Sequence, residues 1–403
     1  MNAMNGNLNS TAYRQLMVRV AATACIVSCC LVLLDLWDNR DLFDPDGITY
    51  LDMADAYLRG DWRAALIGLW SPLYPWLLAL MMLFFTPAGQ WEFTAVHALN
   101  LVIYLIELAT FSVFMLEFLR AIKKTPARLR LPEWSWLVLG YSLFTWSTIR
   151  MMPVHLPEPD AIVCSLVYLI FALLFRMRTE VVTWGKWILF GVLLGLSSPG
   201  AVTTGLRTWY GFEYSPDRTV GALLTLLCVI VVMNLRDVSI FRSITEHWFV
   251  LVPIGAVMGL YSLLHFEGRY IAACVVVLWM VLFRSVAIPY SPESKRIFTA
   301  ALATAALVVA MALAAQTGQA VLHAAQYFTD SKNEAPFLQS GYTNWKVANF
   351  LQTATVREGE PVGSVGWTFS AYWARMARLH IIAEVPEEGR VAFWSSEGPQ
   401  KRG

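Results

Sequence analysis

Long apolar runs, separated by short polar stretches, dominate the chain up to about residue 317. A bilayer core is about 30 Å thick, so a helix that rises about 1.5 Å per residue needs roughly 20 apolar residues to cross it. Nine runs meet or approach this length, at residues 20–37, 94–119, 133–149, 160–177, 182–198, 219–235, 247–264, 270–287 and 297–316. The pattern therefore predicts an all-α membrane protein that crosses the bilayer about nine times.

The composition strengthens this prediction. Hydrophobic residues make up 57% of the 403 residues and charged residues only 15%, which is too apolar for a soluble globule of this size. The net charge is +1, and no basic patch with interleaved aromatic residues is present. We therefore expect contact with membrane lipids and no binding to nucleic acid.

The positions of the cations predict the orientation of the chain. Lysine and arginine favour cytoplasmic loops, and alternate loops between the predicted spans are basic, with Arg14 and Arg19 before the first of them. The N-terminus is thus expected in the cytoplasm of a bacterial cell, with the C-terminus on the periplasmic side of the inner membrane. The opposite loops contain some arginine as well, so the bias is a tendency.

One apolar run, 72–85, is predicted not to cross the membrane. Its unbroken part, residues 76–85, reaches only about 15 Å, which is half of the bilayer core. A crossing here would also move the basic cluster around Lys123 to the outside. We interpret the run as a juxtamembrane or re-entrant helix within one long outer loop, 38–92.

Aspartates crowd the first part of this outer loop. Eight of them lie between Asp35 and Asp61, and Asp44 and Asp46 are separated only by Pro45. A carboxylate near the bilayer surface is suited to act as a general base or to hold a divalent cation. The alternative interpretation is that these residues are solvated or cap the following helix, 48–58, for which Asp46 is well placed.

A second outer turn contains three prolines, which hold His155, Glu158 and Asp160 where the fourth predicted span begins. One interpretation makes Glu158 or Asp160 a second acidic group of a site, since rigid loops suit preorganised sites. The other is simpler, because a negative charge is favourable at a helix N-terminus, where Asp160 lies.

A third outer turn contains His265, Glu267, Arg269 and Tyr270. An arginine on the outer side runs against the usual charge bias. Its guanidinium is suited to bind a lipid phosphate through charge-assisted hydrogen bonds. The alternative is an internal ion pair between Glu267 and Arg269 in a tight turn.

From residue 318 the sequence becomes typical of a soluble segment. Residues 361–366 are predicted as a strand, 368–377 as a helix and 378–384 as a second strand, which together resemble a βαβ unit. We therefore divide the chain into a transmembrane domain, 1–317, and a small extracytoplasmic α/β segment, 318–403, which is expected to be truncated relative to a complete doubly wound domain.

Several short motifs resemble the GT-C glycosyltransferases, in particular the bacterial relatives of dolichyl-phosphate-mannose protein mannosyltransferases and of lipid A aminoarabinose transferases. The first outer loop carries Asp46-Gly-Ile-Thr-Tyr50, an Ala-x-x-x-Gly-Asp-Trp pattern over 56–62, and Ser-Pro-Leu-Tyr-Pro over 71–75. Further similarities are Pro159-Asp160, Arg269-Tyr270 and, in the C-terminal segment, the stretches 371–375 and 381–384.

This resemblance implies an inverting transfer of a hexose or pentose from a polyprenyl-phosphate donor to a protein, lipid or glycan acceptor on the periplasmic face. Asp46 would be the general base, while Asp160, or Glu158, would orient the acceptor or share a cation. The implied catalytic residues are thus Asp46, Asp160 and Glu158; Arg269, Tyr270 and His265 would bind the donor phosphate, and Asp44, Tyr50, Tyr74 and His155 the substrates.

A divalent cation, Mg²⁺ or Mn²⁺, held by Asp46 and Asp160 is compatible with this scheme, although nothing in the sequence requires it. The sequence departs from the resembled pattern in its number of spans, in a short loop at 199–218 and in its C-terminal segment. The alternative function is therefore a non-catalytic GT-C-like membrane protein, such as a transporter, a binding protein or a scaffold subunit.

Overall fold

The chain in the computed structural model divides into two compact units. The helical unit contains Met1–Asp35, Val102–Val154 and Asp160–Leu322, and the mixed unit contains Leu36–Leu101, His155–Pro159 and His323–Gly403. The described residues are 2–40, 44–66, 72–85, 91–124, 133–179, 189, 246–264, 268–285, 310–311, 313–315, 317–325, 340–354, 356–366, 368 and 371–395.

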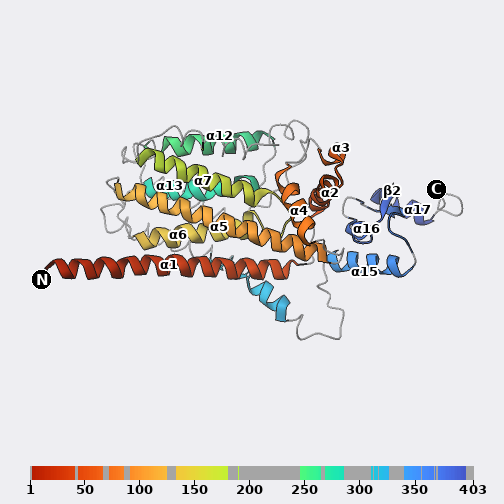
Figure 1. The fold of residues 1–403 in the computed structure, drawn as a ribbon, viewed down its shortest axis with the longest axis horizontal. Helices are drawn as coiled ribbons and strands as arrows, with labels where there is room; N and C mark the ends of the chain where they lie inside the picture. Colours follow the sequence, from red (N-terminus) through yellow and green to blue (C-terminus); the bar gives the residue numbers. More distant parts are fainter. Residues whose placement is uncertain are drawn as a thin grey trace. The chain divides into compact units, whose positions relative to one another are not determined.

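The described part of the helical unit consists of long apolar helices that lie side by side (Figure 1). Three of the helices are long and apolar enough to cross a membrane, over Thr11–Asp38, Glu92–Lys123 and Asp160–Arg178. The principal helices are α1 (Asn2–Asp38), α5 (Glu92–Lys124), α6 (Glu133–Trp146), α7 (Asp160–Thr179), α12 (Trp248–Leu264) and α13 (Gly268–Ser285), and α6 continues into a short π-helix, η2 (Ser147–Met151). The end of α1, 36–38, and the beginning of α5, 92–101, belong to the mixed unit.

Six of the nine predicted spans coincide with these helices, so the prediction of a mostly helical fold is confirmed, and three of the six are long and apolar enough to cross a membrane. The predicted span 219–235 and most of 182–198 and 297–316 lie outside the described residues. The total of nine spans stays a prediction.

Aromatic packing joins α5, α6 and α7 in the interior of the helical unit. Phe111 of α5 stacks on Phe144 of α6 at 4.6 Å between ring centroids, and its ring meets Tyr168 of α7 edge-on at 5.1 Å. All three side chains are fully buried. Offset and edge-to-face contacts of this kind stabilise a core by about 0.5–1.5 kcal/mol per pair beyond the burial of apolar area.

A buried chain of hydroxyl groups joins α1 to the same core. The Thr145 hydroxyl donates to Ser28 Oγ at 2.9 Å, and Ser28 Oγ and Tyr104 Oη share a hydrogen bond of 2.7 Å. Hydrogen bonds between buried hydroxyls stabilise the helices that carry them, so the chain fixes α1 against α5 and α6.

Glu107 of α5 faces the interior of this unit. Its side chain is fully buried, and neither carboxylate oxygen has a hydrogen-bond partner among the residues that the structure describes. Burying an ionised carboxylate without a partner in an apolar interior costs much free energy. We therefore expect the Glu107 side chain to be in its neutral, protonated form.

We predict that Glu107→Gln leaves the thermal unfolding temperature of the purified protein within about 3 °C of wild type, because a neutral carboxyl and an amide differ little in size and charge. Glu107→Lys is expected to lower it by far more, since the new charge has no described partner. Tryptophan fluorescence during heating in detergent measures both variants, and a large loss in Glu107→Gln would mean that the carboxylate is ionised and paired.

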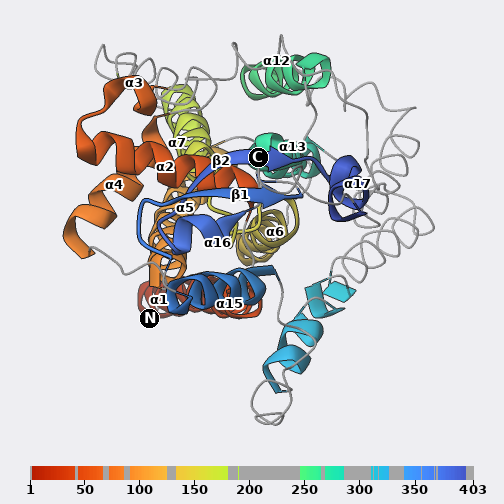
Figure 2. The same cartoon turned by 90° about the vertical axis from the view of Figure 1, so that its right-hand side faces the viewer.

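The mixed unit combines short helices with a small parallel sheet (Figure 2). Strands β1 (Pro361–Val365) and β2 (His380–Val385) pair in parallel with a shift of register between Val362 and Gly363, and α16 (Tyr372–Met376) lies between them in sequence. The predicted βαβ unit is therefore confirmed, with a shorter helix than expected. The other elements are α2 (Pro45–Arg59), α3 (Trp62–Ala65), α4 (Leu73–Phe85), α15 (Ser340–Thr353), a 3-10 turn (Glu387–Gly389) and α17 (Arg390–Ser395).

Helix α4 corresponds to the apolar run that was predicted not to cross the membrane. Its 13 residues extend about 20 Å, less than the thickness of a bilayer core. Tyr74, at its start, is fully buried, whereas Trp76, Leu80 and Leu83 are more than half exposed. These three side chains recur at helical spacing, so α4 presents one apolar face away from its own unit.

Candidate functional site

Three carboxylates converge at the N-terminus of α2. One carboxylate oxygen from each of Asp44, Asp46 and Glu158 lies within 4.8 Å of the others. All three residues belong to the mixed unit, although Glu158 lies more than 100 positions further along the chain. We call Asp44, Asp46 and Glu158 the acidic triad.

Local chemistry explains why Asp44 and Asp46 lie here. Asp44 is the N-cap of α2, since its Oδ1 accepts a hydrogen bond of 2.8 Å from the amide of Asp46. Pro45 follows in the first turn, where its missing N–H costs nothing and its fixed φ suits the helix. The sequence interpretation that an aspartate caps this helix is confirmed, but the cap is Asp44 and not Asp46, because the helix begins at Pro45.

Two side chains of α5 hold the segment that carries Glu158. His97 Nε2 and the carbonyl oxygen of His155 lie 3.1 Å apart, and the Asn100 amide donates to the carbonyl of Leu156 at 2.9 Å. The Asn100 side chain in turn accepts a hydrogen bond of 2.8 Å from the Tyr74 hydroxyl. Buried polar contacts of this kind fix the backbone of a proline-rich turn.

Three of the predicted substrate-binding residues are buried in this packing. His155 is 8% exposed and Tyr50 3%, and the Tyr50 ring meets that of the fully buried Tyr74 edge-on at 5.4 Å. These side chains support the backbone around the acidic triad. Asp44, the fourth predicted substrate-binding residue, is only partly buried.

A second charged group lies in the helical unit, where α7 and α13 begin. Arg269 Nε and Asp160 Oδ2 are 3.7 Å apart, and both side chains are largely buried. The Arg269 guanidinium also lies 5.3 Å from the centroid of the Tyr270 ring and contacts its hydroxyl. We call Asp160, Arg269 and Tyr270 the arginine cluster.

This cluster brings together two residues from distant predicted turns. The negative charge of Asp160 is also favoured by the N-terminus of α7, as the simpler interpretation of the sequence expected. His265 and Glu267 lie outside the described residues, so the expected roles of His265 in phosphate binding and of Glu267 as an ion-pair partner stay predictions.

The acidic triad has the donor set that a hard divalent cation prefers. Mg²⁺ and Mn²⁺ bind carboxylate oxygens, and fewer than six protein ligands leave positions for water or for a substrate oxygen. The sequence proposed Asp46 and Asp160 as a cation-binding pair. Among the described residues the carboxylates grouped with Asp46 are those of Asp44 and Glu158, and Asp160 belongs to the other unit.

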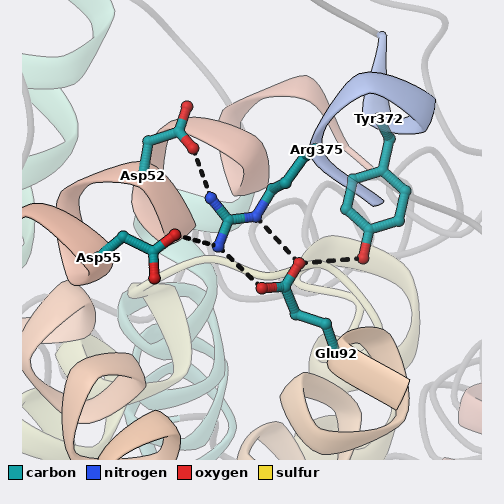
Figure 3. A network of polar contacts seen from close by, with 5 residues as sticks. All are labelled: Asp52, Asp55, Glu92, Tyr372 and Arg375. Carbon is teal, nitrogen blue, oxygen red and sulfur yellow. Dashed lines mark hydrogen bonds and ion pairs between the residues drawn. The ribbon is translucent and has the colours of Figure 1, made fainter. Parts of the chain in front are cut away.

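A third constellation, which the sequence did not predict, surrounds Arg375 of α16 (Figure 3). Its guanidinium binds both oxygens of Glu92, through Nη2 at 2.8 Å and Nε at 2.9 Å, and Nη2 also contacts Asp55 at 2.8 Å. Nη1 contacts Asp52, and the Tyr372 hydroxyl donates to Glu92. Only the one-turn spacing of Asp52 and Asp55 hinted at a shared partner.

Arg375 is a permanent cation in this setting. Burial by itself would lower its pKa, but the hydrogen bonds and charge of Glu92, followed by the charges of Asp55 and Asp52, outweigh burial and raise the pKa above its usual range. Burial, and then the charge of Glu92, raise the pKa of Tyr372. The tyrosine therefore stays a hydrogen-bond donor at any physiological pH.

Comparison of the chain with protein families, with curated proteins and with solved structures finds no match. A function is therefore inferred from the chemistry of these three constellations together with the sequence motifs.

Proposed function

We propose that the protein is a membrane glycosyltransferase of the GT-C type, which moves a sugar from a polyprenyl-phosphate donor to an acceptor on the outer face of the bacterial inner membrane. The observation that carries the proposal is the acidic triad at the start of α2, where Asp46 lies beside two further carboxylates. The motif around Asp46 supports it independently, since its resemblance to the first outer loop of these enzymes was apparent from sequence.

The proposed reaction is a single displacement at the anomeric carbon. The acceptor hydroxyl oxygen forms a bond to this carbon while the bond from the carbon to the phosphate oxygen breaks. The proton of the hydroxyl passes to the carboxylate of Asp46, and polyprenyl phosphate leaves with the bonding electron pair. One displacement inverts the configuration at the anomeric carbon.

The acidic triad and the arginine cluster have separate roles in this scheme. In the mixed unit, Asp46 accepts the proton, and Glu158 and Asp44 orient the acceptor or share a cation with it. In the helical unit, Arg269 binds the donor phosphate through charge-assisted hydrogen bonds, and Asp160 fixes the direction of its guanidinium. If a divalent cation binds, Asp44, Asp46 and Glu158 would hold it, and it would supply further positive charge.

Sugar transfer by the purified protein in lipid nanodiscs tests the proposal. Synthetic polyprenyl-phosphate hexoses and pentoses serve as donors, and a membrane extract supplies acceptors. Mass spectrometry is expected to detect release of polyprenyl phosphate together with a product of inverted configuration. The assay with and without EDTA decides whether a cation takes part.

The opposite result is equally informative. If the protein binds these donors but releases no polyprenyl phosphate with any of them, the non-catalytic alternative of a binding, transport or scaffold protein is favoured. If it neither binds nor cleaves them, the proposed donor class is wrong.

A further inference from the structure

Arg375 links three parts of the mixed unit that lie far apart in the sequence. It projects from the C-terminal βαβ unit, while its partners lie on α2 (Asp52 and Asp55) and at the first position of α5 (Glu92), as Figure 3 shows. Its side chain is 8% exposed and that of Glu92 is 3% exposed. One arginine thus carries most of the polar contact between these elements that the structure records.

Negative charges outnumber positive charges in this contact. Three carboxylates contact one guanidinium, and those of Asp55 and Glu92 are largely buried, so without Arg375 these two negative charges would lie together with little water to screen them. A lysine could not replace the contact fully, since an ammonium group cannot make the parallel hydrogen bonds that the guanidinium makes to Glu92. The arrangement therefore depends on an arginine at this position.

Helix α2 transmits the constraint to the acidic triad. Asp52 and Asp55 are three residues apart and hence neighbours on one face of the helix. Asp46 lies six positions before Asp52 in the same regular helix, a distance of about 9 Å along its axis. Fixing the face with Asp52 and Asp55 therefore fixes both the rotation of α2 and the direction in which its first turn points.

We propose that Arg375 is a positioning residue, through which the C-terminal βαβ unit holds α2 in the orientation that brings Asp46 to Asp44 and Glu158. The catalytic consequence rests on the proposed function, whereas the structural coupling does not. In this scheme the C-terminal βαβ unit holds α2 in place through Arg375. The activity of the acidic triad then depends on this contact, although the βαβ unit contributes no residue to the triad.

Hydrogen–deuterium exchange of the full-length protein in nanodiscs tests the coupling directly. The Asp52→Ala/Asp55→Ala variant removes the two contacts to α2 and leaves the one to Glu92. Alanine has the highest helix propensity, so faster exchange cannot come from a weaker intrinsic helix. We expect exchange in the first turn of α2 to rise about tenfold, while α16 exchanges as in wild type.

The converse variants complete the test. Arg375→Gln is expected to loosen both α2 and α16, and Arg375→Lys to lie between Arg375→Gln and wild type. Arg390→Gln is the matched control, because the ion pair of Arg390 with Glu387 is exposed. In the transfer assay, the loosened variants are expected to lose about tenfold in kcat with the KM for the donor unchanged, since binding of the lipid phosphate is assigned to Arg269.

Two results would overturn the proposal. One is an Asp52→Ala/Asp55→Ala variant whose first turn of α2 exchanges as slowly as in wild type. The other is an Arg375→Gln variant in which only α16 loosens, which would make Arg375 an anchor for the C-terminal segment alone. If the wild-type protein transfers no sugar, the proposed function fails. The exchange data still decide whether Arg375 holds α2 in place.

Discussion

Asp46→Asn is expected to lower kcat for sugar transfer by about 10²–10⁴-fold, because this is the usual contribution of a positioned general base. Asparagine has nearly the same shape as aspartate but cannot accept the acceptor proton at neutral pH. The helix should be unaffected, since the N-cap of α2 is Asp44 and not Asp46. Release of polyprenyl phosphate, measured by mass spectrometry with saturating donor, reports the loss.

The matched control for this variant is Asp61→Asn in the same loop. Asp61 caps α3 by accepting a hydrogen bond of 3.1 Å from the amide of Ala64, and asparagine caps a helix about as well. We expect this control to keep full activity and an unchanged unfolding temperature. If Asp46→Asn also keeps full activity, Asp46 is not the base, and the assignment of the acidic triad as the catalytic centre fails.

The sequence predicted those features that depend on local pattern. Apolar length predicted the long helices, and the alternation of strand, helix and strand predicted the βαβ unit. It also predicted that 72–85 is too short to cross a bilayer. These features could be predicted because each depends on neighbours within about 20 residues of chain, where helix length and turn chemistry decide the outcome.

Contacts between distant segments could not be predicted in this way. Arg375 lies 283 positions from Glu92 and 323 from Asp52, and no local pattern indicates that these side chains meet. Glu158 was offered only as an alternative to Asp160, because two acidic residues separated by a single proline in one turn cannot be assigned from spacing. The structure groups Glu158 with Asp46, and Asp160 with Arg269, in different units.

The second large loss of kcat is expected when Arg269 is replaced. The charge that develops on the leaving group explains the size of this loss. A polyprenyl-phosphate sugar is a phosphodiester with one negative charge, whereas the released polyprenyl phosphate approaches two. A guanidinium therefore binds the transition state more tightly than the donor, so its removal lowers kcat and not only affinity. Arg269→Gln is expected to reduce kcat by about 10²–10³-fold, a loss typical of a single electrostatic stabiliser.

The Arg269→Lys variant separates the contribution of the positive charge from that of the guanidinium geometry. Lysine keeps the charge but loses the fixed fork of donors and the contact with the Tyr270 ring, so we expect it to recover part of the loss. Arg390→Gln is the control, since it removes the same charge from an exposed ion pair with Glu387. Tryptophan fluorescence during heating checks that each variant is folded. Equal kcat in Arg269→Gln and wild type would show that Arg269 serves only as the partner of Asp160, and phosphate binding would then have to be sought at another residue.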